Sequence, residues 1–119
     1  MYIPRAIYPT VKDRLKAQKV LILLGARRVG KTELIKHLLA EFEPTDYLLL
    51  NGEDQLTQQM LEERSVANYK RVIGKRTLLV IDEAQKIPGI GLKLKLMVDE
   101  IPGLRVLVTG SSVFDLSNQ

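Results

Sequence analysis

Residues 20–32 read VLILLGARRVGKT, an apolar run followed by a basic segment with two glycines. The run at 20–24 is continuous rather than alternating, which is typical of a strand buried on both faces of a parallel sheet. The next eight residues, Gly25 to Thr32, match the pattern G-x-x-x-x-G-K-S/T at every position. A strand, this loop and a helix in succession predict an α/β fold that binds phosphate.

Each residue type in the loop suits a phosphate chain. Glycine at positions 25 and 30 allows close backbone approach, and loop N–H groups with the following helix N-terminus attract phosphate oxygens. Lys31 is long enough to reach the β- and γ-phosphates, and the Thr32 hydroxyl can bind Mg²⁺. The predicted nucleotide-binding residues are Gly25, Ala26, Arg27, Arg28, Val29, Gly30, Lys31, Thr32 and Glu33.

Three further apolar runs resemble the one at 20–24 and predict three more buried strands, at 47–50, 78–81 and 105–109. Apolar residues on one helical face predict a helix over 31–42 that Pro44 ends. A second helix is predicted over 54–64, and an opening helix over 11–19 with Thr10 as its N-cap.

The segment 90–98, IGLKLKLMV, alternates apolar residues with period two, as a strand would. It nevertheless connects two predicted strands of one parallel sheet, and such a connection needs a crossover that is usually a helix. We therefore predict a helix here. The whole chain then reads as alternating strands and helices, which is an α/β layered sheet.

Composition limits the other possibilities. A chain of 119 residues has room for one domain, and 45% hydrophobic residues are enough for a core. Cysteine is absent, which excludes disulfides and thiolate metal sites. No segment approaches the ~20 apolar residues that span a bilayer, and the first ten residues do not resemble a signal peptide, so we expect a cytoplasmic protein. A net charge of +4 is too mild to indicate nucleic-acid binding.

The apolar run at 78–81 ends in Asp82 and Glu83. Ligands bind at the carboxyl ends of parallel strands, so Asp82 is a candidate Mg²⁺ ligand. Glu83 is a candidate general base that orients and deprotonates a water. The Asp-x-x-Gly and Asn-Lys-x-Asp motifs of signalling GTPases are both absent, and the dinucleotide fingerprint G-x-G-x-x-G is absent too.

Polar residues also end the other two strands. Thr109 ends the run at 105–109 and is a candidate for positioning the attacking water, with Ser111 as its alternative. Asn51 ends the run at 47–50 and can either hydrogen-bond Glu83 or form a turn with Gly52.

The segments GARRVGKTELI, YLLLNGED, TLLVIDEAQKIPG and RVLVTGSS resemble those of the AAA-type predicted ATPases of bacteria and archaea. The resemblance implies a P-loop NTPase three-layer sandwich of the additional-strand class with a mostly parallel sheet. It also implies that Gly25–Thr32 is the Walker A loop, that Asp82 and Glu83 are the Walker B acids, and that Thr109 is sensor 1. Asn51 would then lie where such proteins often place a residue that switches the catalytic glutamate.

The family's members are several hundred residues long, so the resemblance implies that residues 1–119 are one incomplete ATPase domain from a longer protein. The family strand order is 5-1-4-3-2, and here strand five, the helical lid and any arginine finger are missing, leaving order 1-4-3-2. Strand 20–24 would then be an unpaired apolar edge, so we expect self-association through it.

These observations favour an ATP-binding domain that uses Mg²⁺ and hydrolyses ATP in the longer protein, with Lys31, Glu83 and Thr109 as the candidate catalytic residues. One alternative is a nucleotide-dependent switch without significant turnover that changes affinity for a protein partner. Another is a fragment of a helicase-like motor, because DEAQ resembles helicase acidic motifs. A phosphotransferase is the least supported, since it has no obvious need for Glu83.

Overall fold

The computed structural model describes residues 15–24 and 28–110, with the backbone alone at residues 24 and 28–32. Its elements, in chain order, are β1 (Lys19–Leu24), α2 (Arg28–Leu39), β2 (Tyr47–Asn51), α3 (Gln55–Met60), α4 (Val66–Ile73), β3 (Leu78–Asp82), the 3₁₀ helix η1 (Ala84–Lys86), α5 (Ile90–Glu100) and β4 (Arg105–Gly110).

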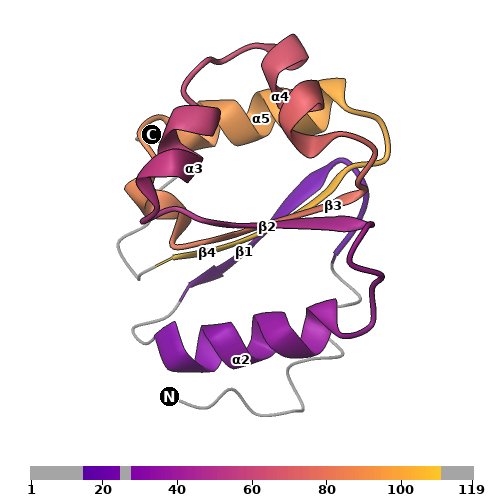
Figure 1. Ribbon diagram of the computed structural model, residues 1–119, viewed down its shortest axis with the longest axis vertical. Coiled ribbons are helices and arrows are strands. Elements are labelled where there is room, and N and C mark those ends of the chain that lie inside the picture. Colours follow the sequence, from indigo (N-terminus) through magenta and orange to yellow (C-terminus); the bar gives the residue numbers. More distant parts are fainter. Residues whose placement is uncertain (1–14, 25–27, 111–119) are drawn as a thin grey trace.

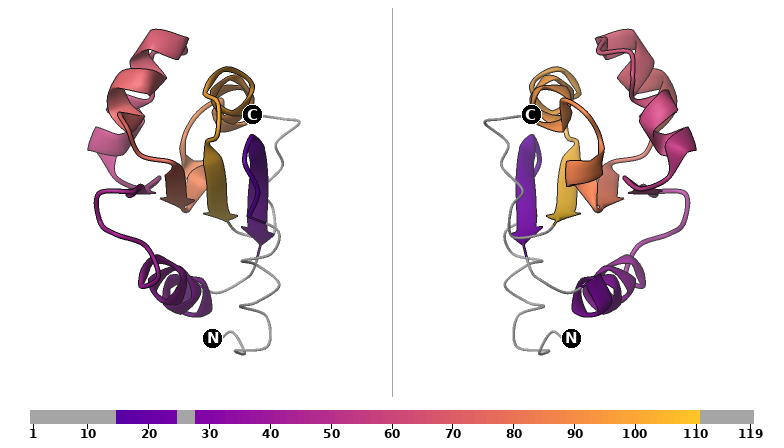
Figure 2. Two further views of the ribbon diagram at one scale, coloured as in Figure 1. Left: turned by 90° about the vertical axis from the view of Figure 1, so that its right-hand side faces the viewer. Right: turned by 90° about the vertical axis from the view of Figure 1, so that its left-hand side faces the viewer.

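The four strands form one sheet in the order β1-β4-β3-β2, and all three neighbouring pairs are parallel (Figure 2). This confirms the predicted α/β fold, its strand order and the four predicted strands. In this sheet β3 and β4 are central and almost wholly buried, whereas β1 and β2 form the two edges and are partly exposed.

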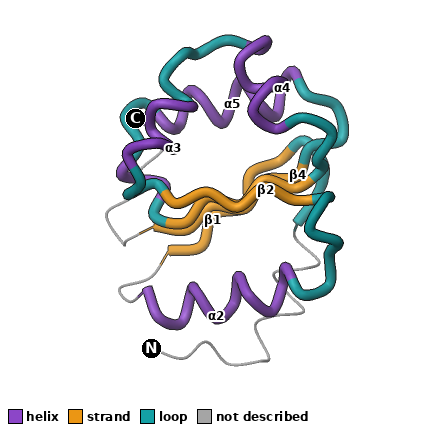
Figure 3. The backbone as a smooth tube through the Cα atoms, viewed as in Figure 1, coloured by secondary structure: helices purple, strands orange, loops and turns teal. Residues whose placement is uncertain are grey.

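Helices cover both faces of the sheet, as Figures 1 and 3 show: α2 lies on one face, and α3, α4 and α5 lie on the other. On the α2 face, side chains from α2 pack against the sheet with Leu15 and Phe42. On the α5 face the cluster is larger, because three helices and η1 contribute to it. The central strands supply both clusters, since their alternate side chains point to opposite faces.

The predicted opening helix over 11–19 is wrong in its described part. Residues 15–18 form a turn into β1 rather than a helix, and residues 11–14, like the predicted cap Thr10, lie outside the described residues. Gln18 has a φ of 62°, and its N–H donates to the carbonyl oxygen of Leu104 at 2.6 Å. This bond connects Gln18 to the loop before β4. The positive φ of Gln18 is not compatible with an α-helix that continues through it.

Two further helix boundaries differ from the prediction. Helix α2 begins at Arg28, three residues before the predicted start, and ends at Leu39 rather than at Phe42. The next turn is tightened by bonds from Glu41 N to Leu38 O and from Phe42 N to Leu39 O, at 3.2 and 3.0 Å. Such a tightened turn is common at helix ends, and here it precedes Pro44.

The helix predicted over 54–64 is shorter, and the sequence analysis missed α4. Helix α3 has Asp54 as its N-cap, and the predicted helix stops at Leu61, the C-cap. Helix α4 then begins after its N-cap, Ser65, whose hydroxyl accepts a hydrogen bond from the N–H of Asn68. The predicted helix at 90–98 is confirmed as α5, so its alternating pattern does not reflect a strand.

Among the described helices, none is both long enough and apolar enough to cross a membrane.

Candidate functional site

The carboxyl ends of the strands bring the predicted site residues to one edge of the sheet. Asn51 is paired in register with Asp82, and Leu23 with Thr109. Leu24, which pairs with Gly110 at the end of β4, is the residue that precedes the predicted phosphate loop in the sequence. Four separate segments of the sequence therefore converge at this edge.

Thr109 connects the two acidic residues. Its hydroxyl donates a short hydrogen bond to Asp82 Oδ1 and accepts one from the backbone N–H of Glu83 at 3.1 Å. The Thr109 side chain is 0% exposed and Asp82 is half-buried. Because the single hydroxyl proton is directed at Asp82, Thr109 orients that carboxylate in this structure.

Glu83 has an unusual backbone conformation at the end of β3. Its φ and ψ are 53° and 47°, in the left-handed region that non-glycine residues rarely adopt. Its N–H is held by Thr109, and its carbonyl oxygen accepts a hydrogen bond from Lys86 N at 3.1 Å. Strained backbone of this kind persists only where surrounding contacts hold it, and it is concentrated at functional sites.

Gly52 supports Glu83 from the neighbouring strand. Its N–H donates to Asp82 O at 2.7 Å, and a Cβ built at Gly52 would overlap the carbonyl oxygen of Glu83. Only glycine therefore allows the loop after β2 to approach the Glu83 turn this closely. The sequence predicted only a turn at Gly52; a glycine directly after a predicted strand was the available signal.

Two glutamines that the sequence analysis did not identify complete this support. Gln58 on α3 donates from Nε2 to Gly52 O at 2.8 Å and to Lys86 O at 3.3 Å. Gln85 on η1 donates from Nε2 to Glu83 Oε1 at 2.9 Å. The position of Glu83 thus depends on α3 and η1, whose mutual packing could not be inferred from local sequence.

The side-chain oxygen of Asn51 accepts a hydrogen bond from the backbone N–H of Glu53 at 2.9 Å. This is the local turn that the sequence analysis held open as one of two roles for Asn51. Ser111, the alternative to Thr109, lies outside the described residues.

The predicted phosphate loop lies between β1 and α2. Gly25, Ala26 and Arg27 fall outside the described residues, and residues 28–32 form the N-terminal part of α2 with only their backbone described. Glu33 follows with an exposed side chain. The side-chain roles assigned to this loop therefore remain predictions.

The residues present fit a Mg²⁺ ion that is bound mainly by a nucleotide. Within residues 15–24 and 28–110 there is no group of three or more His, Cys, Asp or Glu side chains that could hold a metal by itself. Mg²⁺ bound to phosphates usually keeps several waters and takes only one or two protein ligands. Asp82 uses Oδ1 to accept from Thr109, which leaves Oδ2 for the ion or for one of its waters.

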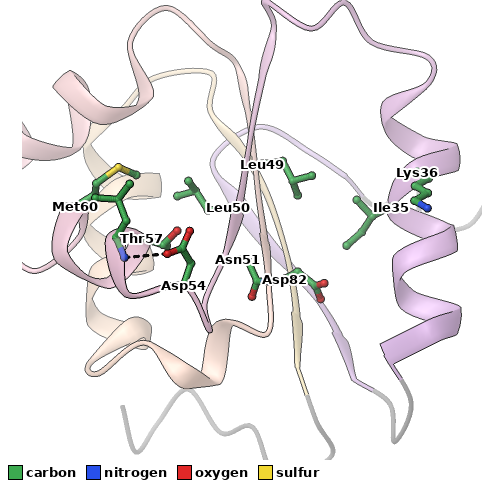
Figure 4. Close-up of a pocket in the computed structure, with 10 residues that line it drawn as sticks. Ile35, Lys36, Leu49, Leu50, Asn51, Asp54, Thr57, Met60 and Asp82 are labelled. Carbon is green, nitrogen blue, oxygen red and sulfur yellow. Dashed lines mark hydrogen bonds between the residues drawn. The ribbon is translucent and has the colours of Figure 1, made fainter.

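A cavity of about 430 Å³ adjoins this edge, around β2. Figure 4 shows Leu49 on the side of Ile35 and α2, and Leu50 on the side of Met60 and α3. Asn51, Asp54 and Asp82 supply carbonyl and carboxylate oxygens along the polar part of its lining. The cavity is mostly apolar and lies beside the convergent strand ends, next to the candidate Mg²⁺ ligand.

A family model described as an AAA domain matches residues 17–119. This range includes all four strands and every predicted site residue. No curated protein and no solved structure matches the chain.

Proposed function

The chain belongs to the AAA domain family, a family of nucleotide-binding domains, and from that premise we propose that it binds ATP with Mg²⁺ and hydrolyses it. The oxygen of the attacking water forms a bond to the γ-phosphorus while one of its protons passes to the Glu83 carboxylate. The bond from the γ-phosphorus to the β–γ bridging oxygen breaks, and its electron pair stays on ADP. Inorganic phosphate is the second product.

One arrangement carries the proposal: Thr109 joins Asp82 to the backbone of Glu83 at the edge where the phosphate loop begins. A candidate metal ligand and a candidate base are thereby fixed next to each other at the end of a buried strand. Hydrolysis of this type depends mainly on positioning and on charge stabilisation. Buried, hydrogen-bonded groups on central strands supply the required rigidity.

The roles divide between the two parts of the site. Lys31 and the loop N–H groups hold the β- and γ-phosphates. Thr32 and Asp82 hold Mg²⁺, which neutralises the charge that develops on the phosphate oxygens. Glu83 accepts the proton from water, and Thr109 keeps Asp82 in position.

The proposal also concerns the protein to which this domain belongs. We propose that residues 1–119 are part of a longer ATPase located in the cytoplasm, and that turnover of this stretch alone is weak. Arginine fingers in related reactions contribute about 10³–10⁵ in rate, and no such residue is assigned in this chain.

The exposed edge of β1 supports self-association of this stretch through β-strand pairing, since β1 is hydrogen-bonded on one side only within the described sheet. We expect light scattering across a dilution series to give a mass that rises with concentration. A constant monomeric mass would refute self-association without affecting the nucleotide site.

Calorimetric titration with Mg²⁺-ATP, with GTP as competitor, tests nucleotide binding. We expect saturable binding that prefers ATP and is lost in Lys31→Ala, because that variant removes the phosphate-binding charge. Lys36→Ala, an exposed lysine on the same helix, is the matched control and should bind like wild type. Equal binding by both variants would contradict the assignment of Lys31.

Turnover is tested with Glu83→Gln, which keeps the shape of the side chain and removes the base. We expect Mg²⁺-ATP to bind as in wild type, and turnover to fall by about 10²–10⁴-fold, the usual contribution of a general base. Binding without turnover in the longer protein would instead support a nucleotide-dependent switch.

A further inference from the structure

The Glu83 carboxylate accepts a hydrogen bond from a residue of its own turn. The side chain is 5% exposed, and Oε1 accepts from Gln85 Nε2 at 2.9 Å. Gln85 lies only two residues along, on η1. The 3₁₀ turn that begins after the left-handed residue brings the two side chains together.

The other half of the Gln85 amide is unsatisfied. Its Oε1 is buried and has no hydrogen-bond partner within the described part of the chain. Rotating the amide would not correct this, because it would place the oxygen against the Glu83 carboxylate and leave the N–H donors elsewhere. A buried acceptor of this kind is costly unless a donor arrives.

The attacking water is such a donor. The amide nitrogen and oxygen of Gln85 are bonded to one carbon, so the unsatisfied oxygen lies close to the carboxylate. A water between the two groups would direct one hydrogen at Glu83 and the other at Gln85. Its oxygen lone pair would then be free to attack phosphorus.

We propose that Gln85 is the positioning residue for this site: its amide N–H holds the Glu83 carboxylate, and its amide oxygen orients the attacking water. The inference rests on the proposed function. It assigns to Gln85 the control over Glu83 that the sequence analysis considered for Asn51, whose side-chain oxygen is used by the turn at Glu53.

The hydrogen bonds that hold η1 in place support the same assignment. Gln58 bonds both Gly52 O and Lys86 O, and Lys86 N bonds Glu83 O. These contacts fix both ends of the short segment that carries Gln85. The side chain of Gln85 therefore projects from a held backbone, as a positioning group requires.

The test compares Gln85→Met with Gln59→Met, an exposed glutamine on α3 as matched control. Gln85→Met has nearly the same shape but neither donor nor acceptor. We expect its kcat to fall about tenfold to hundredfold, as misplacement of a reacting group does. KM and the calorimetric Kd for Mg²⁺-ATP should stay within about twofold of wild type, since P-loop contacts are unchanged.

A purely structural role would give a different result. Gln85→Met removes an unsatisfied buried acceptor, which favours the folded state, and also the N–H that bonds Glu83 Oε1, which disfavours it; the two effects offset, so its unfolding temperature should change little. An unchanged kcat would overturn the proposal. So would parallel losses of kcat, nucleotide affinity and unfolding temperature.

An independent measurement does not depend on turnover. The side-chain amide signals of Gln85 in nitrogen–proton correlation spectra should move in Glu83→Gln, because a charge-assisted hydrogen bond becomes a neutral one. The signals of Gln59 should not move. If the longer protein binds ATP without turning it over, hydrolysis is refuted, and this spectrum still tests the bond from Gln85 to Glu83: unmoved Gln85 signals would overturn the proposal.

Discussion

The two faces of the sheet contribute different parts of the site. The α2 face carries the helix that begins within the predicted phosphate loop, packed through a small cluster with Leu15 and Phe42. The α5 face carries a larger cluster, and the supports of Glu83 come from its helices α3 and η1. In the proposed function, nucleotide binding depends on the α2 face, and the position of Glu83, the proposed base, depends on the α5 face. A change on one face should alter one property more than the other.

Core truncations should show the largest difference in stability between the faces. Leu94→Ala on α5 should cost about 3–5 kcal/mol of unfolding free energy, and Leu38→Ala on α2 about 2–4 kcal/mol. Both side chains are buried, but Leu94 belongs to the larger cluster of buried residues, so its truncation removes more packing contacts than that of Leu38 does. Denaturant unfolding measures both values. A larger loss for Leu38→Ala would contradict the comparison.

Gly52→Ala should have the next largest effect. The added Cβ would overlap Glu83 O, so the Glu83 turn must move. We expect a loss of about 1–3 kcal/mol in unfolding free energy, as for overpacking elsewhere. Turnover should fall more than Mg²⁺-ATP affinity does, since the base moves and the phosphate loop does not.

Gly74→Ala is the control for this change. Gly74 has a φ of 64°, and a Cβ there would meet nothing within 4 Å. It should cost about 1–3 kcal/mol through backbone strain and leave turnover unchanged. Equal losses of turnover in the two variants would remove Gly52 from the support of Glu83.

Tyr69 on α4 gives a smaller effect of opposite sign. Its side chain is 0% exposed, and its hydroxyl has no hydrogen-bond partner among the described residues. Tyr69→Phe should therefore raise the unfolding free energy by about 1 kcal/mol, because it removes an unsatisfied polar group. A loss of stability would show that the hydroxyl has a partner in solution.

Ionisation of Tyr69 should also make the unfolding free energy depend on pH. Burial raises the pKa of the Tyr69 phenol above its ordinary value of 10.0, and the Arg64 charge offsets part of this rise. Above pH 10 the unfolded chain releases the proton before the folded chain does, so stability falls with rising pH. The fall should be shallower in Tyr69→Phe, as measured by unfolding between pH 9 and 11.

Asn51→Ala should have the smallest effect. It removes the bond to Glu53 N in an exposed turn and should cost about 0.5–1 kcal/mol. Turnover should stay within about twofold of wild type, since the control of Glu83 lies with Gln85. A loss comparable to that of Gln85→Met would return the role to Asn51.

The sequence was sufficient to predict those helices and strands that depend on patterns of neighbouring residues. Continuous apolar runs identified all four strands, and topology resolved α5 against its own period-two pattern. Helix α4 was missed because the break before it depends on side-chain hydrogen bonds from Asn68 to residues five and eight positions earlier. Asn68 on α4 donates to Met60 O and Glu63 O, both at 2.9 Å, and so caps the end of α3. No local pattern reveals such a bond.

The same distinction applies to the site. Asp82, Glu83 and Thr109 were identified because each ends an apolar strand, and parallel strands end at one edge. Gly52, Gln58 and Gln85 were not identified as parts of the site, because their roles arise from the approach of α3 and η1 to Glu83. Turns and short helices are placed by tertiary contacts, which sequence patterns do not record.

In the proposed function, Asp82 and the phosphate loop together form one Mg²⁺-ATP site. Calorimetric titration of ATP with and without Mg²⁺, in wild type and in Asp82→Asn, tests it most directly. We expect wild type to bind ATP about tenfold or more tightly with Mg²⁺, the usual scale of interactions with a charged partner. In Asp82→Asn this enhancement should largely disappear, while binding without Mg²⁺ persists. The same enhancement in both proteins would contradict the account.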